Sequence, residues 1–282
     1  MTARPVRAPA KINLMLEVTG RRADGYHEID TVLHELSLAD EVSLEPGPGD
    51  VAVSGPQAAG VPSGEENVVW KAARELADRV ERRDIGFSFH VHKEIPAAAG
   101  LGGGSSDAAA ALRLLAREWR APEAAVLGAA AAVGSDPPFF VKGGCARARG
   151  RGEVLDPLPP LPRHGVVLFV PSVTIDSKTA TLFAALGGLP FDDGAAVDDF
   201  LREHPRELGG DRLTNSFERV AFDLFPGLGS LRAEIESATG SRTRLAGAGP
   251  TLFWIGPPPE AAAVAERAAT TDCTVIATET AP

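Results

Sequence analysis

Apolar side chains recur at every second position in two parts of the chain, residues 11–19 and residues 86–92. A period of two places such side chains on one face of a β-strand, so both segments are predicted to be strands. Residues 166–170, VVLFV, are apolar throughout. That short continuous run predicts a strand buried on both faces.

Three further segments are predicted to be helices, two from the spacing of their apolar residues and one from its alanine content. Residues 107–119 place Ala, Leu and Trp side chains on one stripe, and Asp107 lies in the first turn, where the helix dipole favours negative charge. Residues 67–82 show a similar spacing, and residues 122–133 are rich in Ala. Strands and helices alternate irregularly, which favours an α+β fold over a doubly wound sheet.

Proline and glycine predict where the chain divides. The segment 156–163, DPLPPLPR, is the best candidate boundary, so we expect two domains, 1–156 and 157–282. Within the second domain, the Gly- and Asp-rich residues 187–199 predict a loop.

The composition excludes several classes of protein. The chain has 28 Lys and Arg against 38 Asp and Glu, a net charge of −10, which disfavours nucleic-acid or membrane binding through a basic surface. Its two cysteines, Cys145 and Cys273, are too few for a disulfide framework or a thiolate metal cluster. No signal-peptide-like segment or apolar run long enough to span a bilayer is present. We therefore expect a cytoplasmic protein without nucleic-acid or membrane partners.

A glycine-rich segment at 96–107, PAAAGLGGGSSD, lies between a predicted strand and the predicted helix 107–119. Glycine allows the backbone to approach a ligand, and the first turn of a helix offers unpaired N–H groups and a positive dipole end to an anion. The hydroxyls of Ser105 and Ser106 suit phosphate oxygens or Mg²⁺-bound phosphate. The segment matches neither the Walker nor the dinucleotide pattern. A phosphate site is favoured over a flexible linker.

Two polar positions and a second glycine turn leave alternatives open. Lys11 and Asn13 share the strand face opposite the apolar stripe, where the pattern alone favours a solvated face over a polar site. Asp136 precedes Pro137 and is either a helix N-cap or a carboxylate directed into a cleft as a base. The turn at 247–251, GAGPT, either packs tightly or closes the phosphate site.

Other polar residues carry weaker signals. His90 and His92 share a strand face, but no third ligand has suitable spacing, so no metal site is predicted there. Arg147, Arg149 and Arg151 alternate within CARARGRGE and either contact phosphate or lie in an exposed loop.

These motifs, taken in order, resemble those of the GHMP small-molecule kinases. APAKIN at 8–13, the glycine segment at 96–107 and AGAGPT at 246–251 follow the order of the family's three motifs. RADGYHE at 22–28 and GSDPPFF at 134–140 are similar to members that phosphorylate a cytidine diphosphate ester of a sugar alcohol. The resemblance covers nearly the whole chain. It implies an α+β GHMP kinase fold, with an N-terminal ribosomal-protein-S5-like domain, a C-terminal ferredoxin-like domain and the active site between them.

The resemblance also implies roles for single residues. Lys11 and Asp136 would be the catalytic pair. Tyr26 would stack on the cytosine ring of the substrate, and His27 would form hydrogen bonds with it. Asn13 would hold the polyol of the substrate or orient the catalytic aspartate.

ATP and Mg²⁺ are the cofactors that the resemblance implies. Phe183 would cover the second face of the cytosine, while Asn67, Val69 and Lys93 would form the adenine pocket. The remaining ATP-binding positions form the glycine segment: Pro96, Ala97, Ala98, Ala99, Gly100, Leu101, Gly102, Gly103, Gly104, Ser105 and Ser106. Mg²⁺ would bind through the phosphates with help from Ser106.

Two motifs depart from the family pattern. GSDPPFF carries Ser135 and Pro137 where Ala and Val are usual, and AGAGPT lacks two hydroxyls, so we expect weaker nucleotide contacts without loss of activity. One alternative function is a homoserine- or mevalonate-type GHMP kinase, which would not need DGYHE. Another is a catalytically silent nucleotide-binding module, which would not need both Lys11 and Asp136. We expect a monomer or a weak homodimer.

Overall fold

A computed structural model describes residues 4–159, 161–269 and 272–282, and its chain forms two compact units. Each unit combines segments that are separated in the sequence. Unit 1 comprises Met1–Lys11, Leu38–Ala97 and Gly102–Gly143, and unit 2 comprises Ile12–Ser37, Ala98–Leu101 and Gly144–Pro282. The strands β1 (Val6–Arg21) and β2 (His27–Pro46) pass through both units. A domain boundary after residue 156 stays a prediction.

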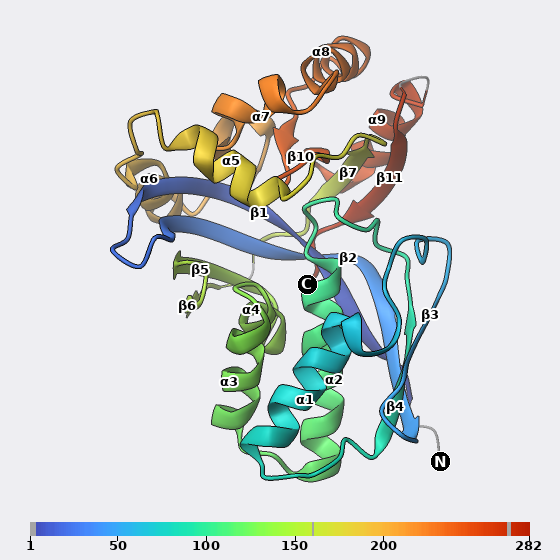
Figure 1. Cartoon of the computed structure of the whole chain (residues 1–282). Coiled ribbons are helices and arrows are strands. Elements are labelled where there is room, and N and C mark those ends of the chain that lie inside the picture. The colour runs from blue at the N-terminus through green and yellow to red at the C-terminus, as the bar shows by residue number, and fades with distance from the viewer. Residues whose placement is uncertain (1–3, 160, 270–271) are drawn as a thin grey trace. The chain divides into compact units, whose positions relative to one another are not determined.

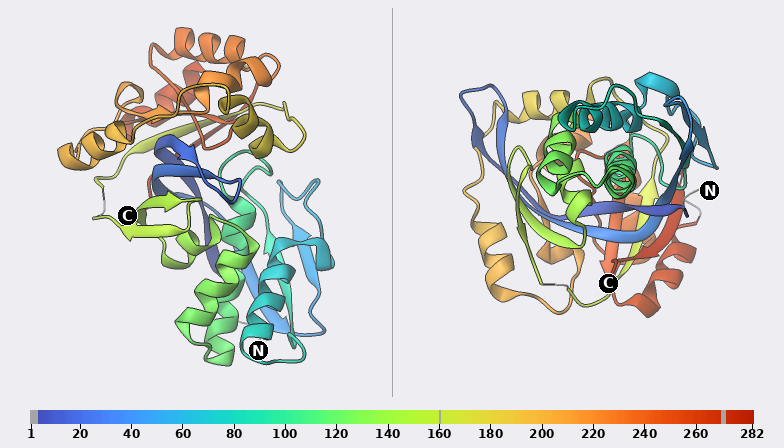
Figure 2. Two further views of the ribbon diagram at one scale, coloured as in Figure 1. Left: turned by 60° about the vertical axis from the view of Figure 1, so that its left-hand side comes forward. Right: turned by 90° about the horizontal axis from the view of Figure 1, so that it is seen from below.

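Unit 1 combines helices with a small mixed sheet (Figure 1). Strand β3 (Val51–Ser54) pairs in parallel with β4 (Phe87–His92), and β4 pairs antiparallel with Glu41–Pro46 of β2. A parallel pair needs a crossover connection, which contains α1. The helices are η1 (Gly64–Glu66), α1 (Val68–Arg79), α2 (Gly103–Trp119), α3 (Glu123–Val133) and α4 (Pro137–Lys142). Helices α1 and α2 pack side by side (Figures 1 and 2).

The apolar patterns account for the core of unit 1. Phe89 and Val91 of β4 are buried together with Leu76 of α1 and Leu112 of α2, whereas His90 on the opposite face of β4 is exposed. The strand predicted at 86–92 and the helices predicted at 67–82 and 122–133 are therefore confirmed. Each element buries one apolar face and leaves the other to solvent or polar contacts.

The helix predicted over 107–119 begins earlier than its apolar stripe indicates. It starts at Gly103, so Gly103 to Ser106 form its first turn and not a loop. Gly102 is the N-cap residue and has φ of +75°. Glycine weakens helices only through backbone entropy, and here the first turn is fixed by its surroundings.

Unit 2 contains two sets of strands. Strand β5 (Cys145–Gly150) pairs antiparallel with Ile29–His34 of β2 and with β6 (Val154–Pro157), and β8 (Thr214–Asn215) pairs in parallel with β1. The other sheet has the antiparallel order β11 (Thr274–Glu279), β7 (Gly165–Val170), β10 (Leu252–Gly256) and β9 (Arg244–Leu245). Numbered along the chain this order is 4-1-3-2, the order of a ferredoxin-like sheet.

The helices of unit 2 are α5 (Lys178–Leu186), α6 (Ala195–Glu203), η2 (Gly210–Arg212), α7 (Glu218–Leu224), α8 (Leu228–Thr239), η3 (Pro258–Glu260) and α9 (Ala261–Arg267). As predicted, residues 166–170 form a buried strand, because β7 pairs with β10 on one side and β11 on the other. The loop predicted at 187–199 extends only to Gly194, because residues 195–199 are the first residues of α6. Of the arginine-rich segment, Arg147 and Arg149 lie in strand β5, whereas Arg151 lies in the turn that follows it.

The polar face of β1 is not solvated, contrary to its pattern. Lys11, Asn13 and Glu17 are each 5% exposed. Within unit 2, the Asn13 amide donates to Thr31 Oγ1 (2.8 Å), and a Glu17 carboxylate oxygen accepts from the Val197 N–H (2.8 Å). Buried polar groups persist where such partners satisfy them.

Among the described residues, no helix is long and apolar enough to cross a membrane. The same residues contain no cluster of three or more His, Cys, Asp or Glu side chains that could hold a metal ion. Cys145 is a free thiol, and burial raises its pKa to about 12. A thiol with so high a pKa is a poor nucleophile.

Candidate active site

The N-terminus of α2 is shaped by a glycine that tolerates no side chain. A Cβ on Gly102 would lie 2.8 Å from Phe140 Cζ and 3.1 Å from Lys11 Cγ, so the stem of Lys11 packs against the start of the helix. Ser106 N–H donates to Gly102 O at 2.9 Å, and the preceding N–H groups of the first turn have no partner within the helix. This end of α2 can therefore donate to an anion such as a phosphate.

Lys11 and Asp136 form an ion pair in unit 1. Lys11 Nζ lies 3.8 Å from Asp136 Oδ2, and the side chains are 7% and 36% exposed. Asp136 is the N-cap residue of α4, and Pro137 occupies the first helical position, but the aspartate side chain makes no capping hydrogen bond. Asp136 thus has the sequence position of a cap, while its carboxylate is paired with Lys11 and remains partly open.

Lys93 belongs to a second charged cluster, which is buried. Its ammonium donates to Asp40 Oδ2 and to Asp107 Oδ2 (2.6 Å), and all three side chains are at most 4% exposed. Asp40 Oδ1 accepts from the backbone N–H groups of Glu94 (2.6 Å) and Ile95 (2.8 Å). Burial raises the pKa of Asp107 to about 7, although the charge of Lys93 acts in the opposite direction.

This cluster holds the end of β4 to the first turn of α2. A Cβ on Gly103 would lie 3.3 Å from Lys93 Nζ, which places the ammonium directly beside that turn. The ammonium is enclosed by carboxylates and not presented at the surface. A direct contact between Lys93 and ATP stays a prediction.

The other adenine-pocket residues support the start of α1. Asn67 is its N-cap: Oδ1 accepts from the Val69 N–H (2.9 Å), and Nδ2 donates to Pro62 O (2.6 Å). Val69 is fully buried in the core of unit 1. Ser106, in the first turn of α2, has a buried Oγ without a hydrogen-bond partner among the described residues. The unpartnered Ser106 Oγ is therefore available to a ligand. The contacts of Asn67 and Val69, in contrast, are those of a helix cap and a core residue.

In unit 2, the middle of the glycine segment packs against the second glycine turn. Gly100 has φ of +86°, and a Cβ there would lie 2.3 Å from Ala246 O and 2.9 Å from Gly249 O. Lys178, the first residue of α5, donates to Ala98 O (2.7 Å) and to Gly249 O. The structure brings together the two turns that the sequence analysis singled out, and adds a lysine that it missed.

Unit 2 also holds an aromatic cluster around the DGYHE motif. The rings of His27 and Phe183 stack with centroids 4.5 Å apart and an angle of 11°. Phe191 meets the edge of His27 (6.1 Å), and Phe217 meets Phe183 (4.9 Å). His27 Nε2 is buried and has no hydrogen-bond partner in the part of the chain that the structure describes.

The imidazole of His27 is neutral near pH 7. Burial, and to a smaller extent the charge of Arg21, lowers the pKa of His27 from its usual value. A neutral imidazole beside stacked rings can accept or donate one hydrogen bond to a planar base. Phe191, at the edge of this cluster, is a further aromatic residue that the sequence analysis did not identify.

Tyr26 is the exposed neighbour of this cluster. Its side chain is 55% exposed, and the Arg151 guanidinium lies 4.7 Å from its ring centroid. All three arginines of this segment pair with carboxylates: Arg147 with Asp30, Arg149 with an aspartate on β6, and Arg151, in the turn after β5, with Glu153. Of the three, Arg151 is the one placed beside a predicted substrate residue.

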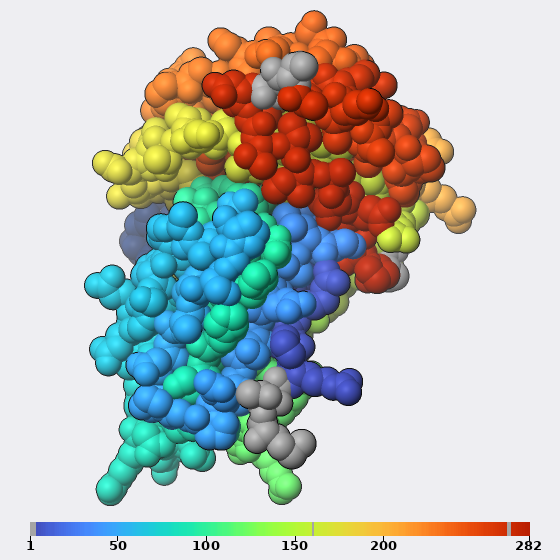
Figure 3. Space-filling view, turned by 90° about the vertical axis from the view of Figure 1, so that its right-hand side faces the viewer, coloured from blue at the N-terminus to red at the C-terminus, as the bar shows by residue number. Residues whose placement is uncertain are grey.

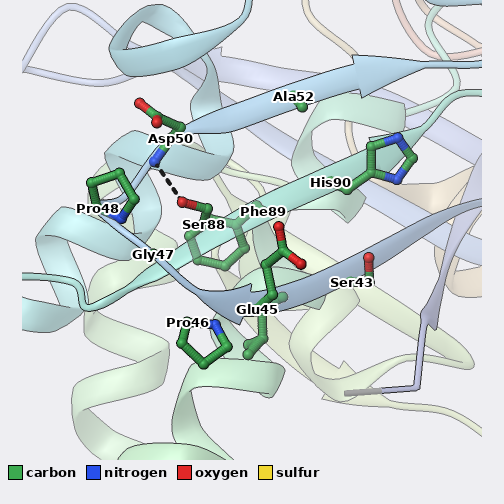
Figure 4. Close-up of a pocket in the computed structure, with 11 residues that line it drawn as sticks. Ser43, Glu45, Pro46, Gly47, Pro48, Asp50, Ala52, Ser88, Phe89 and His90 are labelled. Atoms are coloured by element: carbon green, nitrogen blue, oxygen red, sulfur yellow. Dashed lines mark hydrogen bonds between the residues drawn. The ribbon is translucent and has the colours of Figure 1, made fainter. Parts of the chain in front are cut away.

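One cavity of unit 1 is separate from these residues. It has a volume of about 620 Å³ and lies on the exposed face of β2, β3 and β4, the side of the molecule seen in Figure 3. Glu45, Asp50 and His90 surround it, and Asp50 N–H donates to Ser88 Oγ at 3.3 Å (Figure 4). No Lys or Arg lines this cavity, so its chemistry does not suit a phosphate.

Comparison with known proteins agrees with the motifs. The chain matches the GHMP kinases N terminal domain over residues 67–144 and the GHMP kinases C terminal domain over residues 196–273. A 4-diphosphocytidyl-2-C-methyl-D-erythritol kinase from Dehalococcoides mccartyi is 39% identical over 250 residues, which are 87% of each chain. This chain belongs to the 4-diphosphocytidyl-2-C-methyl-D-erythritol kinase family of GHMP kinases.

Further relatives of this GHMP kinase carry the same name. The protein from Bacillus subtilis is 36% identical over 252 residues, 88% of this chain and 86% of the relative. The crystal structure of a 4-(cytidine 5'-diphospho)-2C-methyl-D-erythritol kinase aligns with a TM-score of 0.79 at 33% identity, covering 99% of this chain and 100% of that one. These relatives confirm the predicted GHMP kinase fold and do not favour the homoserine- or mevalonate-kinase alternative.

Proposed function

We propose that the chain is an ATP-dependent kinase that phosphorylates the 2-hydroxyl of 4-diphosphocytidyl-2-C-methyl-D-erythritol, a step in the non-mevalonate route to isopentenyl diphosphate. The observation that carries this proposal is the Lys11–Asp136 pair, 3.8 Å apart, in the unit where Lys11 packs against the N-terminus of α2. The names of the relatives supply the substrate. We further propose that the protein works in the cytoplasm as a monomer or weak homodimer.

The first turn of α2 supplies the phosphate-binding groups in this proposal. Phosphoryl transfer leaves a protein little covalent chemistry, so positioning and charge stabilisation supply most of the rate. The N–H groups of Gly103, Gly104 and Ser105 and the positive end of the helix dipole would hold the ATP phosphates. Glycine at 102 lets the ring of Phe140 and the stem of Lys11 pack against the start of this helix.

Asp136 and Lys11 act on the acceptor hydroxyl. A carboxylate oxygen of Asp136 would take the proton of the 2-hydroxyl as that oxygen attacks the γ-phosphorus. The ammonium of Lys11 would offset the negative charge that develops on the attacking oxygen. Asp136 is 36% exposed, which leaves its carboxylate open to a substrate.

Mg²⁺ bound with ATP would neutralise part of the phosphate charge in the transition state. The orphaned Oγ of Ser106 fits an oxygen ligand to such an ion, because oxygen donors are the ligands that Mg²⁺ prefers. Ser105, half-buried in the same turn, offers a second hydroxyl to the phosphates.

The aromatic cluster of unit 2 would recognise the cytosine. Tyr26 offers an exposed ring face for stacking, and His27 offers an unpartnered ring nitrogen held by its stack on Phe183. Asn13 would contact the polyol through the amide that now bonds Thr31. A substrate without a nucleobase would gain nothing from this cluster.

A product assay tests the proposal. Purified protein and Mg·ATP are incubated in parallel with 4-diphosphocytidyl-2-C-methyl-D-erythritol, homoserine and mevalonate, and the products are measured by mass spectrometry. We expect the mass of one phosphoryl group to be added to the cytidyl compound alone. Phosphorylation of another acceptor would assign a different kinase activity. ATP binding without transfer to any acceptor would indicate a silent nucleotide-binding module.

A further inference from the structure

One side chain links the two glycine turns of unit 2. Lys178 Nζ donates to the carbonyl oxygen of Ala98 at 2.7 Å and to that of Gly249. The two acceptors lie 80 and 71 positions away in the sequence. Hydrogen bonds from a charged donor are stronger than neutral ones, so this contact favours one arrangement of the two turns.

The backbone at both ends of this link is strained. Ala98 has φ of +53°, and Ser177, the N-cap residue of α5, has φ of +47°. Residues with a Cβ adopt such left-handed values at a cost on the order of 1–3 kcal/mol, and they do so where surrounding contacts compensate. Ala98 supplies an acceptor and Ser177 immediately precedes the donor, so the strain lies where the link is made.

The backbones of the two turns also pack directly against each other. A Cβ on Gly100 would overlap the carbonyl oxygens of Ala246 and Gly249. The Asn215 amide holds the far side of the second turn by donating to the oxygens of Leu245 and Gly247, each at 2.8 Å. Lys178 contributes the bond that joins this held turn to the first one.

We propose that Lys178 is a positioning residue that fixes residues 98–101 against residues 246–249, so that the glycine segment is ordered before ATP binds. This inference rests on the proposed ATP-dependent function. Lys178 acts on the nucleotide through the backbone of the two turns, because its ammonium is bound to their carbonyl groups. Ordering a loop in advance lowers the entropy lost on binding and so raises affinity.

The test compares Lys178→Met, which keeps the length of the side chain but removes the donor, with Lys178→Arg, which keeps the charge and donors. Lys71→Met, at an exposed position of α1, is the matched control. In the protein without nucleotide, we expect Lys178→Met to speed amide hydrogen exchange in peptides covering 98–101 and 246–249. We expect Lys178→Arg to restore slow exchange, and Lys71→Met to leave it unchanged.

The same variants separate affinity from turnover. The ATP KM and the calorimetric Kd for a non-hydrolysable ATP analogue should rise about tenfold in Lys178→Met, the size of one lost charge-assisted hydrogen bond, with kcat unchanged. Unchanged exchange in the two turns, exchange that rises over the whole chain, or a fall in kcat at unchanged KM would each overturn the proposal. Exchange and analogue binding need no phosphoryl transfer, so they remain decisive if the proposed substrate proves wrong.

Discussion

Two lysine–aspartate clusters flank the first turn of α2, and they differ in burial and in geometry. A Cβ on Gly102 would touch the stem of Lys11, and one on Gly103 would lie 3.3 Å from Lys93 Nζ. The Lys93 cluster is at most 4% exposed and contains two carboxylates. The Lys11 cluster contains one carboxylate, at 3.8 Å, which is 36% exposed.

This difference shows that environment, and not residue type, separates a structural pair from a chemical one. A buried ion pair contributes little net stability compared with an apolar replacement, but losing one partner leaves a costly buried charge. The Lys93 cluster therefore fixes where β4 ends and α2 begins. The looser, partly open Lys11–Asp136 pair retains a carboxylate that a substrate can reach.

The largest effect we expect comes from Asp136→Asn. Loss of the proton acceptor should lower kcat by about 10²–10⁴-fold, the usual contribution of general base catalysis. The thermal unfolding midpoint should fall much less than the rate, because the side chain makes no capping hydrogen bond and is partly exposed, although the buried ammonium of Lys11 loses an anionic partner. Steady-state kinetics and a thermal melt measure both quantities. Turnover close to wild type in a folded variant would exclude Asp136 as the base.

Lys93→Met should mainly lower the stability of the protein, whereas Asp136→Asn should mainly lower its rate of turnover. Removal of the ammonium leaves the buried carboxyl groups of Asp40 and Asp107 without their cation, so the free energy of unfolding should fall by about 3–5 kcal/mol. Urea unfolding measures this change, with Lys71→Met as the control, which should stay within about 0.5 kcal/mol of wild type. A stable Lys93→Met protein that has lost only ATP affinity would place Lys93 on the nucleotide.

Tyr26→Ala extends the comparison to an exposed residue of unit 2. Stacking of a base on an aromatic ring contributes about 1–3 kcal/mol, so the KM for the cytidyl substrate should rise by about tenfold or more. Stability should stay near that of wild type, because the side chain is 55% exposed. Val154→Ala removes another exposed apolar side chain and is the control. If both variants bind the substrate equally well, Tyr26 does not stack on cytosine.

The smallest effect that we expect is on how the stability of the protein depends on pH, and it comes from two buried histidines. Burial lowers the pKa of His34 and His164 below the usual value of about 6.5. The unfolded chain therefore binds protons that the folded chain excludes, so stability is full above pH 6.5 and falls as the pH drops below it. Unfolding midpoints between pH 7 and 5 should show a shallower slope for His34→Gln than for wild type. Equal slopes would show that His34 titrates alike in both states.

Much of the fold follows from apolar patterns. The alternation in β4 and the helical spacing in α1 mark the positions that these elements bury, and the continuous apolar run in β7 marks a buried strand. Predictions from these patterns fail where an element buries more than one of its faces. Strand β1 buries polar as well as apolar side chains, each polar one with a partner from another part of the chain. Helix α2 gains a first turn of Gly and Ser, which carry no apolar signal.

The candidate site was partly predictable for a related reason. Motifs supplied Lys11, Asp136 and the glycine segment, because each lies within a short recognisable stretch of sequence. Asp40 and Lys178 escaped prediction, since the contact of Asp40 with Lys93 spans 53 positions. The acceptors of Lys178 are backbone carbonyls, which every residue has, so no pattern of side chains could reveal that link.

Measurement by ³¹P NMR tests most directly whether the Lys11–Asp136 pair promotes transfer of the γ-phosphoryl group of ATP to the cytidyl substrate. Wild-type protein and Asp136→Asn are each mixed with Mg·ATP and 4-diphosphocytidyl-2-C-methyl-D-erythritol, and spectra are recorded over time. We predict that a phosphomonoester signal and ADP grow together with wild type and are delayed at least a hundredfold with the variant. The absence of a phosphomonoester with folded, ATP-binding wild type, or equal rates in the two samples, would contradict the account.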